Sequence, residues 1–156
     1  MSVLEAKNRL EGTTLKDLPV ADGQDLVYDG EVHFQNTEAD GAAGDTWSYA
    51  FKARCDMEIV AVDICPGAAL TANDTNNAVL TLGKADGAGG GSTAILALTT
   101  NLASGNWVTD VFKSMGTPVA AAKRVTKGQI VTLKKTIGGT GVVVPVAGFT
   151  VRYRKV

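Results

Sequence analysis

The closing segment Ala147-Gly-Phe-Thr-Val-Arg-Tyr-Arg-Lys-Val156 decides the fold class of this chain. Apolar and polar side chains alternate in it, with Phe149, Val151 and Tyr153 on one face and Thr150, Arg152 and Arg154 on the other. Successive side chains of a β-strand point to opposite faces of a sheet, so a period of two predicts a strand with one buried face.

The same period of two holds in residues 46–53, where Trp47, Tyr49 and Phe51 alternate with smaller or polar residues. Further runs with strand composition are bounded by glycine, proline or asparagine, at residues 31–35, 57–65, 78–85, 94–100, 106–112, 118–125 and 129–137. About eight short strands at intervals of roughly 10–15 residues, with no alternating helical segments, predict an all-β fold, either an antiparallel β-sandwich or a jelly roll.

The start of the chain lacks this pattern. We expect residues 1–30 to form an extended acidic arm and residues 31–156 to form the β-sandwich domain. Ser2 and Glu5 have the spacing of a capping box and Gly12 offers a stop, which predicts a short helix over residues 3–11. The apolar residues of the arm are scattered among acids, as is typical of a segment that orders only against a partner surface.

Charge is sorted along the chain, with ten acids and three bases in residues 1–45 but twelve bases and six acids in residues 46–156. This asymmetry predicts that the arm meets the basic C-terminal third, between subunits; the alternative is an acidic leader that only aids solubility. We expect the contact to use apolar anchors of the arm and cations on two neighbouring strands: Leu4, Leu10, Leu15, Leu18, Val20, Lys134, Lys135, Arg152 and Arg154.

No catalytic constellation is apparent, so we expect neither an enzyme nor a bound cofactor or metal. His33 is the only histidine and lies in a strand-like stretch away from any serine elbow, which favours a structural role over that of a general base. Gly83-Lys84 is followed by Ala85 rather than by the hydroxyl residue of a phosphate-binding loop. Residues 73–77 are rich in oxygen ligands but lack the glycine and distal glutamate of an EF-hand, which favours a polar turn over a calcium site.

Cys55 and Cys65 are too few for a disulfide framework and are wrongly spaced for a zinc site. We expect both thiols to be reduced and buried; a bridge between them is the alternative if they lie on adjacent strands. The N-terminus has no apolar leader and no run reaches the ~18 apolar residues of a membrane span, so we expect synthesis in the cytoplasm and no membrane contact. The basic third has few interleaved aromatics and no nucleic-acid motif, so no nucleic-acid partner is expected.

Four stretches together resemble the capsid decoration, or cement, proteins of tailed-phage virions, which are built on a β-sandwich. They are Tyr49-Ala-Phe-Lys-Ala-Arg-Cys-Asp-Met-Glu-Ile-Val-Ala-Val-Asp63, Ala78-Val-Leu-Thr-Leu-Gly-Lys84, Val125-Thr-Lys-Gly-Gln-Ile-Val-Thr-Leu133 and Gly148-Phe-Thr-Val-Arg-Tyr-Arg-Lys155. The resemblance lies in their order and covers roughly residues 46–156, so the acidic arm is not part of it.

This resemblance implies a homo-oligomer, a trimer rather than a dimer, that binds the major capsid protein and stabilises the capsid lattice from outside. The protein would then be located on the capsid surface of the virion after synthesis in the host cytoplasm. The alternative is a carbohydrate- or receptor-binding module of a phage tail or fibre, with Trp47 or Trp107 as an exposed stacking platform. A small enzyme is the third hypothesis.

Overall fold

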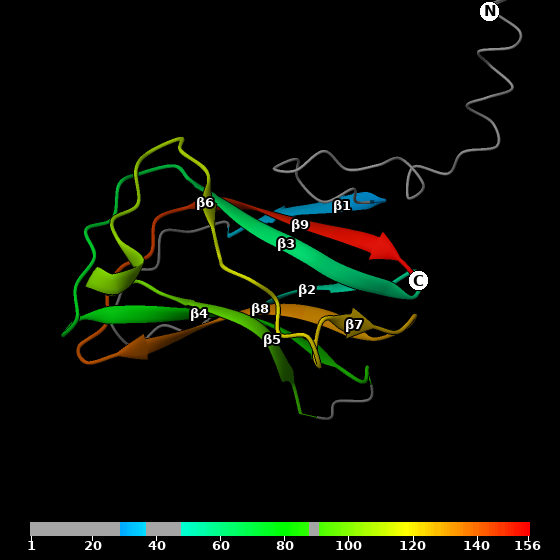
Figure 1. Ribbon diagram of the computed structural model, residues 1–156. Helices are drawn as coiled ribbons and strands as arrows, with labels where there is room; N and C mark the ends of the chain where they lie inside the picture. The colour runs from blue at the N-terminus through cyan, green and yellow to red at the C-terminus, as the bar shows by residue number, and fades with distance from the viewer. Residues whose placement is uncertain (1–28, 37–47, 88–90) are drawn as a thin grey trace, which may run out of the picture.

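The computed structural model of the protein describes residues 29–36, 48–87 and 91–156 (Figure 1). In this part of the chain nine strands and one short 3-10 helix are present. The strands are β1 (Gly30–Gln35), β2 (Ser48–Lys52), β3 (Met57–Pro66), β4 (Asn77–Ala85), β5 (Thr93–Thr99), β6 (Lys113–Ser114), β7 (Arg124–Val125), β8 (Ile130–Gly138) and β9 (Ala147–Lys155), and the helix is η2 (Leu102–Ser104).

The strands form two antiparallel sheets that face each other across one core (Figure 1). The first sheet has the order β1-β9-β3-β6, and β7 also pairs with β3; the second has the order β2-β8-β4-β5. Apart from the β4–β5 hairpin and the link from β6 to β7, every connection passes from one sheet to the other. This is the strand order of a jelly roll built from two Greek keys, so the expected fold class is confirmed.

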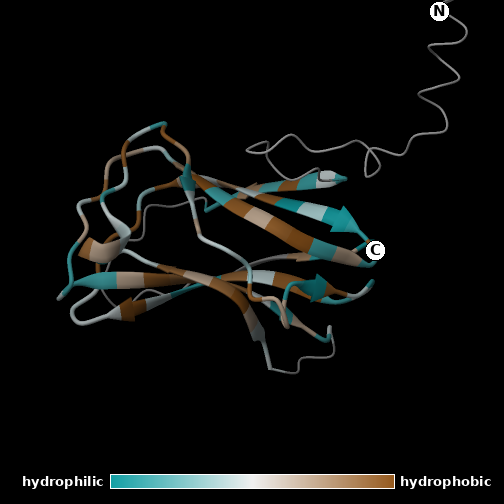
Figure 2. Ribbon diagram, in the orientation of Figure 1, coloured by the Kyte–Doolittle hydropathy of each residue, from teal (hydrophilic) through white to brown (hydrophobic). Residues whose placement is uncertain are grey.

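The core follows from the alternation of side chains along each strand. Phe149 and Val151 of β9 are buried beside Ile64 and Val62, their partners on the neighbouring strand β3. Ile59 of β3 is also buried, and the register shifts between Ile59 and Ala61. Figure 2 shows hydrophobic residues along the strands of both sheets. The first sheet buries one face against the second and leaves the other face to solvent, which is what a period of two predicts for an antiparallel sandwich.

Two of the expected strands are wrong over most of their length. Within residues 106–112 only Trp107 pairs, in an isolated bridge with Leu70, and the nearby strand β6 has two residues. Within residues 118–125 only Arg124–Val125 is a strand. Gly105 and Gly116 flank the first of these segments with positive φ angles of 71° and 106°, so the chain turns before and after it instead of running straight.

Some expectations fall on parts of the chain that the structure does not describe. They are the helix over residues 3–11, the arm up to residue 28 with the anchors Leu4, Leu10, Leu15, Leu18 and Val20, and the side chain of Trp47. Among the described residues, no helix is long and apolar enough to cross a membrane.

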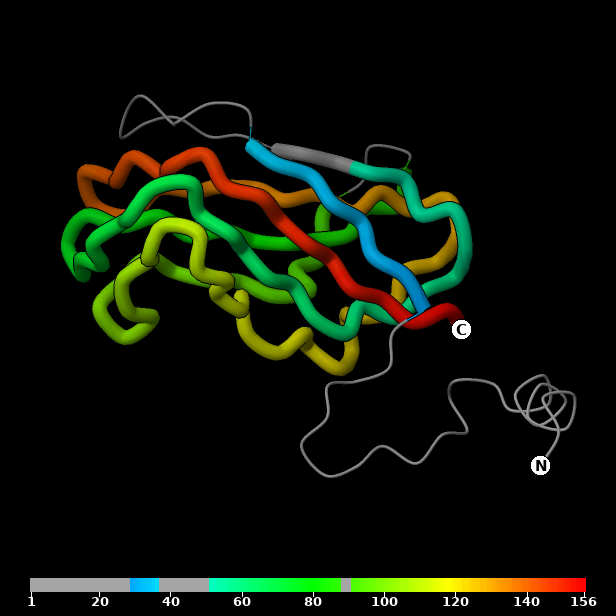
Figure 3. Tube along the Cα trace, turned by 90° about the horizontal axis from the view of Figure 1, so that it is seen from above, coloured from blue at the N-terminus to red at the C-terminus, as the bar shows by residue number. Residues whose placement is uncertain are grey.

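The sandwich has two ends that differ in composition. We define the apolar end by the described connections of residues 67–76, 100–112 and 139–146, on the left of Figure 1, and by the adjoining strand termini. We define the basic end by the connections of residues 53–56, 86–92 and 126–129, by the adjoining strand termini and by residues 29 and 123, which flank such termini. The C-terminus and the start of β1 lie together at the basic end (Figure 3). The two ends therefore offer separate surfaces on one rigid core.

Candidate interaction surfaces

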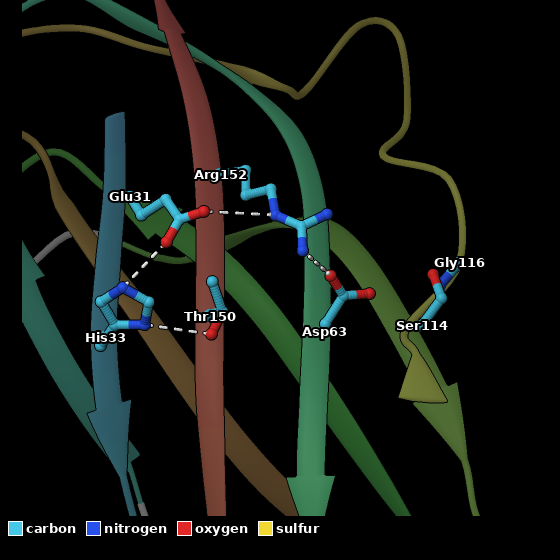
Figure 4. A network of polar contacts seen from close by, with 7 residues as sticks. All are labelled: Glu31, His33, Asp63, Ser114, Gly116, Thr150 and Arg152. Carbon is cyan, nitrogen blue, oxygen red and sulfur yellow. Dashed lines mark hydrogen bonds and ion pairs between the residues drawn. The ribbon is translucent and has the colours of Figure 1, made fainter. Parts of the chain in front are cut away.

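A polar network crosses the solvent face of the first sheet (Figure 4). Arg152 of β9 lies between two acids of its neighbouring strands: its Nη2 is 3.0 Å from Asp63 Oδ2, and its Nε is 3.5 Å from Glu31 Oε1. His33 of β1 has Nε2 2.9 Å from Glu31 Oε2 and Nδ1 3.1 Å from Thr150 Oγ1. The register of β1, β9 and β3 brings these side chains into adjacent cross-strand rows, so the network ties three strands together.

This network places His33 between a hydroxyl and a carboxylate, which the sequence did not reveal because the partners are far apart along the chain. A nucleophilic site also needs donors for the developing oxyanion. Thr150 lies in the middle of β9 and is paired with His33 of β1 on one side and Asp63 of β3 on the other. The backbone amides around Thr150 therefore take part in the pairing of β9 with its two neighbours and do not form an oxyanion hole. We interpret the network as structural.

A second ionic cluster lies at the basic end. Lys123 Nζ is 2.6 Å from Glu58 Oε1, and Arg124 Nε is 3.7 Å from Glu58 Oε2. The hydrogen bond from Lys123, together with the charges of Lys123, Arg124 and Arg154, lowers the pKa of Glu58 against the opposing effect of burial. The cluster holds β7 against the first residues of β3.

The four cations predicted to form one basic face do not lie together. Arg152 and Arg154 are on β9 of the first sheet, whereas Lys134 and Lys135 are on β8 of the second sheet, so the expectation that they occupy neighbouring strands is wrong. Lys134 is exposed, but Lys135 is fully buried, and burial lowers its pKa. Lys135 is therefore not available as a surface cation.

The apolar end exposes most of the large hydrophobic side chains that are accessible in the described residues. Seven of the nine lie there, at Leu102, Val108, Val111, Phe112, Ile137, Val143 and Val146. Among the described residues, the three connections that define this end contain only two charged residues, Asp74 and Asp110. A cluster of exposed apolar side chains with little charge around it is the usual mark of a contact surface.

Hydrogen bonds hold the apolar end in one conformation. Trp107, which is 1% exposed, exchanges two backbone hydrogen bonds with Leu70, at 2.9 and 3.2 Å. The Asp110 amide, at a residue with φ of 59°, donates to the Pro66 carbonyl at 2.8 Å. Residues 108–112 therefore form a turn whose apolar side chains are exposed while its backbone is tied to the body.

Trp107 is consequently a core anchor, and its predicted role as an exposed stacking platform is wrong. The exposed aromatic residue of this region is Phe112, at 65% exposure, which the sequence analysis missed. A signal was present, because Val111 and Phe112 are adjacent and flanked by Asp110 and Lys113. Two adjacent apolar residues between charges break the period of two and point to a turn rather than a strand.

Phe112 borders a hollow of about 470 Å³ on the solvent face of the first sheet. The hollow is lined by His33, Phe34, Gln35, Cys65, Phe112, Gly148, Phe149 and Thr150. It exists because Gly148 stands between Gln35 of β1 and Cys65 of β3 and has no side chain to fill the space. A Cβ at Gly148 would approach nothing closer than the Cys65 carbonyl oxygen, at 4.0 Å.

Cys55 and Cys65 are unpaired, as expected, but both are half-buried rather than fully buried. Cys65 lines the hollow beside Gly148, and Cys55 lies in the connection between β2 and β3 at the basic end. Within the described ranges no three His, Cys, Asp or Glu residues are grouped so that they could hold a metal ion.

No protein-family model and no curated protein matches the chain. Among solved structures, the fold is similar to a chain in the structure of infectious bursal disease virus, Gx strain, with 13% sequence identity and a TM-score of 0.39. The similarity covers 88% of this chain and 37% of the viral chain, so this chain spans little more than a third of the length of the one it matches.

Proposed function

We propose that the protein is a structural component of a phage virion that binds the outer surface of the capsid and stabilises its lattice. The observation that supports this most is the apolar end, where a turn of fixed backbone exposes Val108, Val111 and Phe112. A preformed apolar surface loses little conformational entropy on binding, so it suits docking onto a folded protein. Jelly rolls serve as viral capsid domains, but a fold alone does not determine function.

The proposed partner is the major capsid protein, and the resemblance noted in the sequence supports this choice. The protein would act as a homo-oligomer, a trimer rather than a dimer, so that several apolar ends bind neighbouring capsid subunits at once. Individually weak contacts then add through avidity, which is how a small protein can reinforce a large shell. The protein would have no catalytic role and would be made in the host cytoplasm before it joins the virion.

Counting the copies of the chain per purified particle by quantitative mass spectrometry tests this proposal. A capsid-binding role predicts hundreds of copies that co-sediment with expanded capsids. A handful of copies per particle would place the protein on the tail and overturn the proposal.

The hollow beside Phe112 supports a second candidate, a carbohydrate- or receptor-binding module. The hollow falls within the volume range of ligand sites, roughly 300–1,000 Å³, and has an exposed aromatic ring at its border. A glycan array distinguishes the two functions. Binding that is lost in Phe112→Ala and in the cavity-filling variant Gly148→Val would support the glycan module, whereas particle binding without glycan binding would support decoration.

A further inference from the structure

A groove at the basic end opens between the edge strands of the two sheets. It has a volume of about 360 Å³ and is lined by Val32, Phe51, Lys52, Arg54, Cys55, Met57 and Tyr153. In the described part of the chain, β1 and β2 are each at the edge of a sheet and pair on one side only. We call this cavity the seam groove.

The floor of the seam groove consists of apolar side chains that belong to the core but are not fully covered by the two sheets. Met57 is buried, whereas Val32, Phe51 and Tyr153 pack against the core and remain partly exposed. Partly exposed apolar side chains that continue into a core are stabilised when another apolar segment covers them. The volume and composition of the groove therefore suit a few apolar side chains of an added segment.

The rim of the seam groove is positively charged. Lys52 and Arg54 are both exposed, and no ion pair joins either of them to another residue within the described ranges. A peptide with acids beside its apolar residues would complement this rim.

The chain itself supplies such a peptide next to the groove. The Asp29 amide donates to the Tyr153 carbonyl at 2.8 Å, and Asp29 Oδ2 accepts from the Lys155 amide at 2.6 Å. Asp29, the first residue that the structure describes, is thus held beside Tyr153 in the lining of the groove. Residues 15–22 read Leu-Lys-Asp-Leu-Pro-Val-Ala-Asp, with apolar residues set among acids.

We propose that residues 15–22 bind in the seam groove of their own chain. Pro19 disfavours helical backbone at Leu18, and in a segment bound as a strand the side chains of Leu18 and Val20, two positions apart, would enter the groove from the same side. Asp17 and Asp22, which flank these anchors in the sequence, would complement the charge of the rim that carries Lys52 and Arg54. This contact is within one chain, unlike the contact between subunits expected from charge alone, and it goes beyond the proposed function.

Connectivity favours the chain's own arm over that of a second copy. The eight residues between Val20 and Asp29 can span at most about 30 Å, which is ample for a groove whose wall is bonded to Asp29. A short flexible link gives an effective concentration of order millimolar, so the segment of the same chain outcompetes one supplied by dilute neighbours.

Disulfide trapping tests the proposal, because the groove contains the native thiol of Cys55. The full-length chain would carry Ala21→Cys with Cys65→Ser, so that Cys55 is the one native thiol left. Oxidation of the dilute protein with copper phenanthroline should then give an intrachain disulfide to Cys55, seen as a faster band on a non-reducing gel and as the linked peptide by mass spectrometry.

The matched control is Ala21→Cys with Cys55→Ser, which leaves Cys65 in the hollow beside Gly148. We expect its yield to be lower by about tenfold, because that thiol lacks the local concentration that docking supplies. Adding Leu18→Asp and Val20→Asp should reduce trapping at Cys55 severalfold while the far-ultraviolet circular dichroism of the sandwich stays unchanged. Equal yields at the two cysteines, or a disulfide between chains in dilute solution, would overturn the proposal.

Discussion

The two ends of the sandwich share one core but present opposite surfaces. The apolar end exposes seven large hydrophobic side chains, and its described connections and adjoining strand termini carry three charged residues, Asp74, Asp110 and Lys113. The basic end carries eight bases and four acids: Lys52, Arg54, Lys84, Lys123, Arg124, Lys127, Arg154 and Lys155, and Asp29, Asp56, Glu58 and Asp86. The apolar end therefore suits a contact that excludes water, whereas the charged side chains of the basic end favour a solvated surface.

The two ends are also stabilised differently. At the apolar end, backbone hydrogen bonds such as those between Trp107 and Leu70 fix the connections. At the basic end, the ion pair of Lys123 and Glu58 contributes as well. Backbone hydrogen bonds and buried apolar contacts are insensitive to pH and salt, whereas ion pairs near the surface are weakened by both. Substitutions should therefore act in different ways at the two ends.

The largest effect is expected from Trp107→Ala. Because Trp107 is 1% exposed and anchors the turn of the apolar end, its truncation should lower the free energy of unfolding by about 3–5 kcal/mol. Urea denaturation followed by circular dichroism measures the loss. Arg124→Ala, an exposed change at the basic end, should cost well under about 1 kcal/mol. Similar losses for the two variants would mean that the apolar end is not held by this anchor.

Phe112→Ala should weaken binding without lowering stability. Phe112 is exposed, so its truncation leaves the fold intact but removes an aromatic contact from the docking surface. A loss of about 2 kcal/mol, or about 30-fold in affinity for expanded capsids, is typical of such a residue. Val119→Ala is the matched control, since Val119 is exposed but lies outside the apolar end. If both variants bind with the affinity of the parent, the apolar end is not the contact surface.

The basic end should lose stability in acid because of Glu58. Its pKa in the folded state lies below the ordinary value of 4.5, since Lys123 donates to it and nearby cations attract it. The contribution of ionised Glu58 to the free energy of unfolding is therefore complete above pH 4.5 and is lost as the pH falls through the lowered pKa. An ion pair of this kind contributes up to about 1 kcal/mol. Urea midpoints at neutral and acid pH should show this dependence in the parent and less of it in both Glu58→Gln and Lys123→Met.

The smallest effect is expected at Gly148, on the border of the apolar end. The Cβ of Gly148→Val would meet no atom closer than 4.0 Å, and valine suits a strand better than glycine does. Thermal unfolding should show a gain of about 0.5 kcal/mol. A clear loss of stability would show that a side chain at this position collides with its neighbours, and would contradict an open hollow beside Phe112.

The local sequence pattern predicted most of the long strands well. It could not predict which strands pair with one another in each sheet. The period of two at residues 149–153 identified β9, and the run expected at 57–65 differs from β3 by one residue. No feature of the local sequence shows that β8 and β9 belong to different sheets, so the prediction that their cations form one basic face was wrong. The burial of Lys135 could have been predicted, because a period of two places it on the same face of the strand as the apolar residues Val131 and Leu133.

The interaction surface was harder to predict because it consists of connections. Turns that expose Phe112 and bury Trp107 depend on contacts with distant segments such as Leu70. From composition alone, we predicted a strand over residues 106–112 and an exposed ring at Trp107. The arm anchors, by contrast, lie outside the described residues and stay predictions.

Hydroxyl-radical footprinting of the protein, free and bound to intact particles, tests the central claim most directly. If the apolar end is the contact surface, Val108, Val111, Phe112 and Val143 should be oxidised in the free chain and strongly protected on the particle. Val119 and the exposed residues of the basic end should be modified equally in both states. Protection confined to the basic end, with Phe112 still oxidised on the particle, would contradict the account.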